Sequence, residues 1–203
     1  MKILVSNEEK ISLIEEKFRD ILDILGLDSS LPTIKDTPAR VAKMYVKELF
    51  SGLDPENYPS LSFTDFSPPE YSSYVLVKNI SIQSYCEHHF VPMVGHSHIA
   101  YLPQKKVIGL SKLNRIADYF AKRPQLQERL TAQIAENLCE VLETEDVAVY
   151  TIMSHFCVQM RGIKDKDSFT HSYVLLGKFK DDPELRREFI GNGNANANVH
   201  EFP

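Results

Sequence analysis

The sequence lacks long apolar runs and is poor in cysteine. No apolar stretch in its 203 residues approaches the ~18 residues that a membrane-spanning helix needs. The N-terminus turns charged too soon to contain the apolar region of a signal peptide. Three cysteines, Cys86, Cys139 and Cys157, are too few and too scattered for a disulfide framework. We therefore expect a cytoplasmic protein without a membrane partner, whose cysteines are free thiols or metal ligands.

The sequence also contains fewer basic than acidic residues. The 23 Lys and Arg against 28 Asp and Glu give a net charge of −5, whereas a nucleic-acid binder normally carries a basic surface. This total argues against nucleic acid as a partner but leaves room for a local anion site. Hydrophobic residues at 43% and charged residues at 25% are ordinary values, so we expect a globular chain with a core.

The N-terminal third shows helical periodicity. Apolar residues recur at three- and four-residue steps through residues 7–25. A second helix is predicted from Thr37 as cap and Pro38 at the first helical position to about Gly52. Four prolines within residues 54–71 predict a surface loop. Residues 1–71 should thus form a helical arm and a connecting loop.

The pattern changes to strands after Tyr74. Alternating or β-branched stretches predict strands over residues 74–84, 95–102, 147–155 and 169–179, with helices over 112–123 and 124–143. This order predicts an α+β fold: an antiparallel four-stranded sheet, with two helices between the middle strands packed on one face. We assign this domain to residues 72–190. Residues 191–203 are low in complexity and are expected to form a disordered tail.

The chemically richest segment is CEHH, residues 86–89, which follows the first predicted strand. Thiolate and imidazole are the ligands that zinc prefers, and Cys86 and His89 at this spacing can reach one ion from a single turn. The alternative is a buried cysteine beside surface histidines, because cysteine is commonly buried for packing alone.

A second His and Cys pair, His155 and Cys157, ends a strand predicted to lie nearby. With Cys86, His89 and Cys157 as ligands, a tetrahedral zinc ion keeps one open position for water, which is the arrangement of a catalytic site. His88 and His155 then remain for proton transfer or, alternatively, for orienting the ligands.

Two further clusters could contact an anionic substrate. Lys112 and Arg115 share one face at the start of a predicted helix, where free N–H groups favour a phosphate. A solvated helix surface is the ordinary explanation of such residues, and spacing alone favours it. Arg161 adds a cation close to Cys157 in the sequence.

Glu128 stands at the start of the next predicted helix. Its carboxylate could accept two parallel hydrogen bonds from a guanine edge, or it could simply be a favourable acid in a first helical turn.

Four segments together resemble the GTP cyclohydrolase I family: CEHHFVP, GLSKLNRI, RPQLQERLT and SHFCVQMRG, in this order. The segment DTPAR, residues 36–40, also matches the family's D-T-P-x-R pattern, and the resemblance extends from about Thr33 to Phe179. It implies conversion of GTP to 7,8-dihydroneopterin triphosphate and formate, the first step of tetrahydrofolate and pterin synthesis. In that scheme zinc at Cys86, His89 and Cys157 activates water for attack on C8 of guanine.

The resemblance also implies roles for other residues. His88 and His155 would transfer protons, Glu128 would hold guanine, and the remaining substrate contacts would be Arg40, Ser111, Lys112, Arg115, Gln127 and Arg161. The implied fold is the tunnelling fold, assembled as a toroidal homodecamer with active sites between subunits. The chain departs from the family at Tyr173 and Val174, where smaller hydroxyl residues are common. The alternative function is a zinc-stabilised tunnelling-fold module that binds or regulates without turnover.

Overall fold

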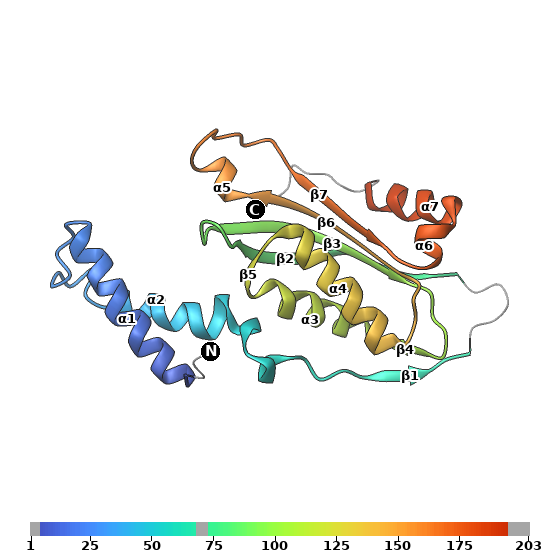
Figure 1. Cartoon of the computed structure of the whole chain (residues 1–203), viewed down its shortest axis with the longest axis horizontal. Coiled ribbons are helices and arrows are strands. Elements are labelled where there is room, and N and C mark those ends of the chain that lie inside the picture. The colour runs from blue at the N-terminus through green and yellow to red at the C-terminus, as the bar shows by residue number, and fades with distance from the viewer. Residues whose placement is uncertain (1–4, 68–72, 195–203) are drawn as a thin grey trace.

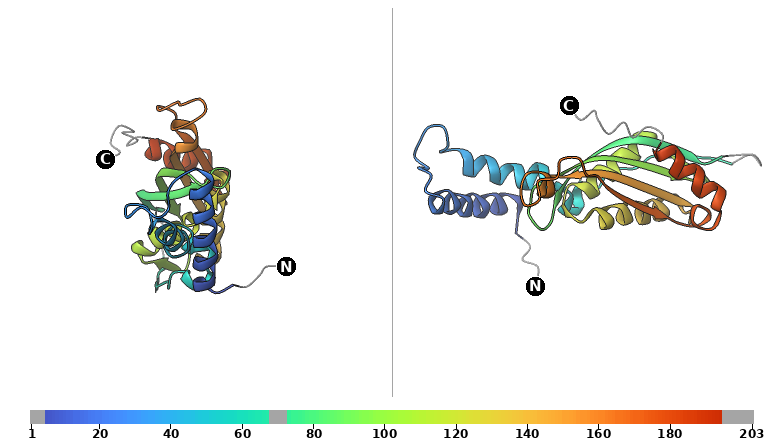
Figure 2. Two further views of the ribbon diagram at one scale, coloured as in Figure 1. Left: turned by 90° about the vertical axis from the view of Figure 1, so that its left-hand side faces the viewer. Right: turned by 90° about the horizontal axis from the view of Figure 1, so that it is seen from above.

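The computed structural model describes residues 5–67 and 73–194 of the chain. Two helices, α1 (Asn7–Ile24) and α2 (Thr37–Met44), form an arm that projects from one end of a sheet domain (Figures 1 and 2). The predicted arm helices are therefore present. Asp36 rather than Thr37 precedes α2, and a π-helical turn, η1 (Tyr45–Leu49), and a 3-10 turn, η2 (Ser51–Leu53), continue it towards the domain.

The central sheet has the strand order β5-β2-β3-β6-β7. Its four long strands, β2 (Val75–Cys86), β3 (Pro92–Tyr101), β6 (Val147–His155) and β7 (Thr170–Leu175), pair antiparallel. The α+β class is confirmed, but the four-stranded prediction needs correction. A two-residue strand, β5 (Pro124–Gln125), pairs parallel with the end of β2 and makes the sheet mixed. Two residues are too few to show any periodicity in the sequence.

One face of the sheet is covered by α3 (Leu110–Ala121) and α4 (Gln127–Leu142) (Figure 1). The predicted stripe on α4 packs into this core: Leu130, Ile134 and Leu138 are fully buried. Burying side chains of this size, at about 2 kcal/mol each, holds α4 firmly against the strands. Its first turn is thereby fixed near the ends of β2 and β6.

The opposite face carries two helices that the sequence patterns did not indicate, α6 (Lys178–Asp181) and α7 (Pro183–Asn194). Phe179 and Phe189 are buried there against Tyr150 of β6. The strand predicted over residues 169–179 thus ends at Leu175, and Gly177, with a φ of +51°, turns the chain into α6. Residues 191–194 of the predicted tail belong to α7, while residues 195–203 lie outside the described residues.

The predicted loop over residues 54–71 is also partly regular. It contains a 3-10 turn, η3 (Pro55–Asn57), and β1 (Phe63–Asp65), which pairs with β4 (Lys106–Ile108); residues 68–72 lie outside the described residues. Just before it, Gly52 donates a backbone hydrogen bond to the Lys122 carbonyl at 2.9 Å. A Cβ at this position would lie 2.0 Å from the Tyr119 carbonyl oxygen, so only glycine permits the close approach of the arm to α3. None of the helices in the described ranges has the length and hydropathy to cross a bilayer.

Candidate active site

The turn between β2 and β3 places the first two predicted ligands together. Phe90, with a φ of +56°, donates its backbone N–H to the Cys86 carbonyl at 2.8 Å, and Cys86 donates to the Val91 carbonyl at 2.9 Å. These bonds close a tight turn over residues 86–90, which we call the metal turn. Within it, Sγ of the buried Cys86 lies 3.8 Å from Nδ1 of the exposed His89.

The third predicted ligand arrives from the end of β6. There the chain turns into a short helix, α5 (Phe156–Gln159), beside the metal turn (Figure 1). The potential ligand atoms of Cys86, His89 and Cys157 all lie within 4.8 Å of one another. Burial raises the pKa of the Cys157 thiol, and contact with Cys86 raises it further. Two adjacent thiols resist double ionisation, so a bound cation is what would hold both as thiolates.

Two other predicted residues border this group. Nδ1 of His88 lies 3.9 Å from Sγ of Cys86, and Nη1 of Arg161 lies 3.1 Å from Nε2 of His89. Both His88 and Arg161 are exposed to solvent. The guanidinium of Arg161 and the imidazole of His88 therefore lie on the solvent-exposed side of the group.

His155 is held by Gln127, the first residue of α4. Nε2 of the Gln127 amide donates to the carbonyl oxygens of Thr151 at 3.1 Å and Thr170 at 2.9 Å, which fixes which way the amide points. Its Oε1 must then face His155, and it lies 2.8 Å from Nε2 of that ring. An amide oxygen only accepts, so Nε2 of His155 carries the proton and Nδ1 of the neutral ring is left as an acceptor.

This contact bears on two predictions. Burial lowers the pKa of His155, while the nearby carboxylate of Glu128 opposes the shift, so the ring is neutral at pH 7. Gln127 was expected to contact substrate, but its side chain is 1% exposed and both ends of its amide bond to protein groups. No pattern in the sequence indicates this role, because it depends on the packing of α4 against β6 and β7.

The predicted cations on α3 lie elsewhere. Ser84, two residues before Cys86, donates to the carbonyl of Ala121 at the C-terminal end of α3. Lys112 precedes Ala121 by nine residues, which is about 14 Å along a helix. Within one chain, Lys112 and the adjacent Ser111 therefore do not reach the metal turn.

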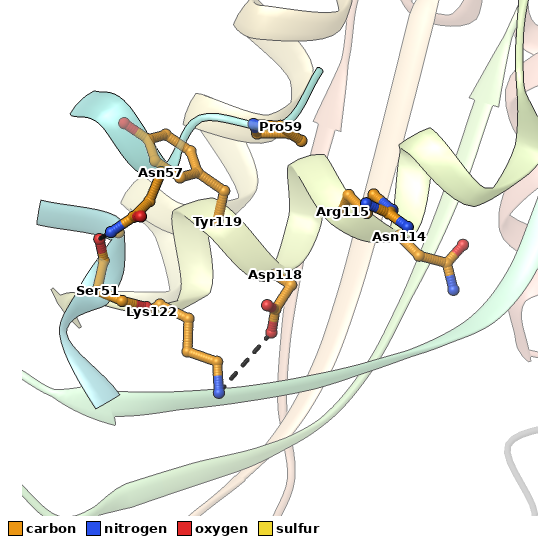
Figure 3. A pocket seen from close by; sticks show the side chains of 9 residues that line it. Ser51, Asn57, Pro59, Asn114, Arg115, Asp118, Tyr119 and Lys122 are labelled. Atoms are coloured by element: carbon orange, nitrogen blue, oxygen red, sulfur yellow. Dashed lines mark hydrogen bonds and ion pairs between the residues drawn. The ribbon is translucent and has the colours of Figure 1, made fainter. Parts of the chain in front are cut away.

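Arg115 and Arg40 are also separate from the metal turn. Arg115 lines a cavity of about 380 Å³ on the outer side of α3, together with Asn57 and Lys122 (Figure 3). Arg40 lies near the start of α2 in the arm, where it is exposed and pairs with Asp36 at 3.5 Å. Substrate contacts at these residues stay predictions.

Comparisons with known proteins identify the family of the chain. The sequence model of GTP cyclohydrolase I matches residues 14–193. The chain belongs to the GTP cyclohydrolase I family. The family and the enzymatic character predicted from the four segments are thereby confirmed.

Individual relatives share about half of their residues with the chain. GTP cyclohydrolase 1 of Flavobacterium johnsoniae is 49% identical over 186 residues, covering 92% of this chain and 82% of the relative. The proteins of the same name from Histophilus somni and Shewanella sp. are each 49% identical. They cover 87% and 91% of this chain, and 81% and 86% of their own lengths.

Proposed function

We propose that this chain is a GTP cyclohydrolase I, which hydrolyses GTP to formate and 7,8-dihydroneopterin triphosphate. The observation that carries the proposal is the convergence of Cys86, His89 and Cys157 within 4.8 Å, beside an oriented His155, in a chain of this family. A module without turnover would have no use for a histidine whose proton-bearing atom is fixed by a buried amide. That alternative is therefore not favoured.

The three converging residues fit zinc. Tetrahedral zinc with bonds of about 2.3 Å to sulfur and 2.0 Å to nitrogen places these two ligand atoms about 3.5 Å apart. The distance between Sγ of Cys86 and Nδ1 of His89 is 3.8 Å, and two thiols with one imidazole are a typical zinc set. Held by these three residues, zinc would supply hydroxide near neutral pH for attack on C8 of guanine.

The chain's own residues would orient the base and move protons. Glu128, exposed in the first turn of α4, accepts two hydrogen bonds from the guanine edge that carries N1–H and the 2-amino group. Neutral His155 receives a proton at Nδ1 and returns it from there, because Gln127 keeps the proton on Nε2. His88, on the solvent side of Cys86, serves as the second proton carrier.

The triphosphate requires cations that one chain does not bring to the metal turn. Arg161 is present beside His89, but Lys112 and Arg115 lie along α3, as does the hydroxyl of Ser111, and Arg40 lies in the arm. We therefore propose that other copies of the chain contribute them, in a toroidal homodecamer of the tunnelling fold. Ring closure would also pair the edge strands of the sheet, which otherwise invite aggregation. A cytoplasmic location is kept as part of this proposal.

The thiols provide a matched test of the proposal. Cys157→Ser should lose zinc in elemental analysis and lose formation of the fluorescent oxidised pterin from GTP. Cys139→Ser is the control, because Cys139 lies in the last turn of α4 and is not part of the metal group. Full zinc content and undiminished pterin formation in Cys157→Ser would contradict the ligand assignment.

A further inference from the structure

Glu87 has no role in the scheme above, although it lies between the predicted ligand Cys86 and His88. Its carboxylate forms an ion pair with the guanidinium of Arg129 in α4. The two side chains are 30% and 42% exposed, so the pair is partly shielded from water. Glu87 thus joins the metal turn to α4, the helix that begins with Gln127 and Glu128.

Arg129 is itself held in place by hydrogen bonds to the segment before α4. Its Nε donates to Oε1 of Gln125 at 3.0 Å, and Nη2 also approaches the Pro124 carbonyl at 3.3 Å. Gln125 is 1% exposed, and its Nε2 donates to the Phe120 carbonyl at 2.9 Å and to Oε1 of Gln133 at 2.8 Å. The guanidinium therefore has a defined place, set by the buried Gln125, which is in turn bonded to α3 and α4.

The backbone links the same two segments. Cys86 is paired with Gln125 in the parallel bridge between β2 and β5, and the Glu87 N–H donates to the Gln125 carbonyl at 3.0 Å. This bridge is only two residues long on the β5 side, so the backbone joins the metal turn to the segment before α4 at few points. The ion pair adds a side-chain attachment to α4 itself, beyond the bridge.

We propose that Glu87 and Arg129 are positioning residues, which set the separation between the metal turn and the guanine anchor on α4. The inference rests on the proposed function. Glu128, the neighbour of Arg129, would hold one edge of guanine, whereas the attacked C8 lies on the other ring beside Cys86, His89 and Cys157. A misplacement of about 1 Å between reacting groups can cost roughly 100-fold in rate. Partly exposed ion pairs contribute little to folding stability, so the effect should appear in turnover.

Steady-state kinetics of four variants with GTP, measured on zinc-loaded protein, test the inference. Glu87→Ala and Arg129→Ala should each lower kcat about 10- to 100-fold. KM should stay within about threefold and zinc content should be that of the wild type, because neither residue binds GTP or metal. The kcat of the double variant should be no lower than that of the less active single variant, since both changes remove the same ion pair. Glu87→Gln keeps an acceptor for Arg129 and should recover part of the lost kcat.

The control is Glu143→Ala, which breaks the ion pair of Glu143 with Lys106 (2.5 Å) at the opposite end of α4. It should keep wild-type kcat. Single variants within twofold of wild-type kcat, multiplicative losses in the double variant, or loss of zinc from Glu87→Ala would each overturn the positioning role. If wild type and Glu143→Ala both fail to convert GTP, the proposed function itself is wrong. An active wild type with an unaffected Glu87→Ala variant overturns the positioning role alone.

Discussion

Replacing Gln127 by leucine tests the contact that orients His155. Leucine is similar in size, so little cavity results, but the variant loses the hydrogen bonds from Gln127 to Thr151, Thr170 and His155. Each is worth about 1 kcal/mol net, and at 1% exposure no water replaces them, so the free energy of unfolding should fall by about 3 kcal/mol. For a chain of this size, that lowers the midpoint of thermal unfolding by about 6–12 °C.

The kinetic effect should be larger than the loss of stability. Without the Gln127 acceptor, the proton of His155 is free to occupy either ring nitrogen, and the ring is free to turn. We expect kcat to fall at least about 100-fold, the usual value of a general acid or base, with KM little changed.

A second variant separates the two effects in the same assays. Gln127→Glu can still accept from His155 but cannot donate to the Thr151 and Thr170 carbonyls. It should lose stability as Gln127→Leu does, yet retain more of kcat. Thermal unfolding followed by circular dichroism and pterin formation from GTP measure the two quantities. Wild-type kcat in Gln127→Leu would refute the reasoning, because His155 would then need no fixed proton.

Three further predictions concern pH, the arm and the assembly. Burial, with Lys78 and His96 nearby, lowers the pKa of His98 to about 4, below the value of about 6.5 in the unfolded chain. The unfolded state therefore binds the proton first as pH falls, and the His98 contribution to the free energy of unfolding should drop by about 2 kcal/mol between pH 7 and pH 5. Urea unfolding should show this drop in wild type and not in His98→Gln; equal drops would contradict it. Gly52→Ala should detach the arm from α3 and speed limited proteolysis between arm and domain, whereas an unchanged digestion pattern would show that the contact is not required. Cys86→Ser and Lys112→Ala should each be inactive alone. When the two variants are mixed, unfolded and reassembled together, part of the activity should return, because some sites then take an intact Cys86 and an intact Lys112 from different subunits. No recovery would place both residues in one subunit's site.

Periodicity predicted the elements that bury a regular stripe. The repeated leucines of α4 and the β-branched residues of β6 indicate a helix and a strand from local sequence alone. The predicted bounds of both elements agree with the structure within a few residues. Phe179 and Phe189 lie in α6 and α7, where their burial depends on the opposite face of the sheet, and β5 exists only because it meets β2. Their local sequences carry no comparable signal.

The candidate site divides in a similar way. The spacing of Cys86 and His89, with the second His and Cys pair at His155 and Cys157, predicted the residues that the structure brings together. The partners of Gln127, Glu87 and Arg129 could not be predicted, since each bond joins segments brought close only by tertiary packing. A carboxylate between two predicted ligands was the single signal for Glu87.

The most direct test of the account is the stoichiometry of the reaction itself. Zinc-loaded, assembled wild-type protein should release one formate for each GTP consumed and form one dihydroneopterin triphosphate, detected as fluorescent neopterin after oxidation and dephosphorylation. Removal of zinc by a chelator should stop both products, and adding zinc back should restore them. GTP left intact by the zinc-loaded protein, or hydrolysed only at its phosphates, would contradict the account.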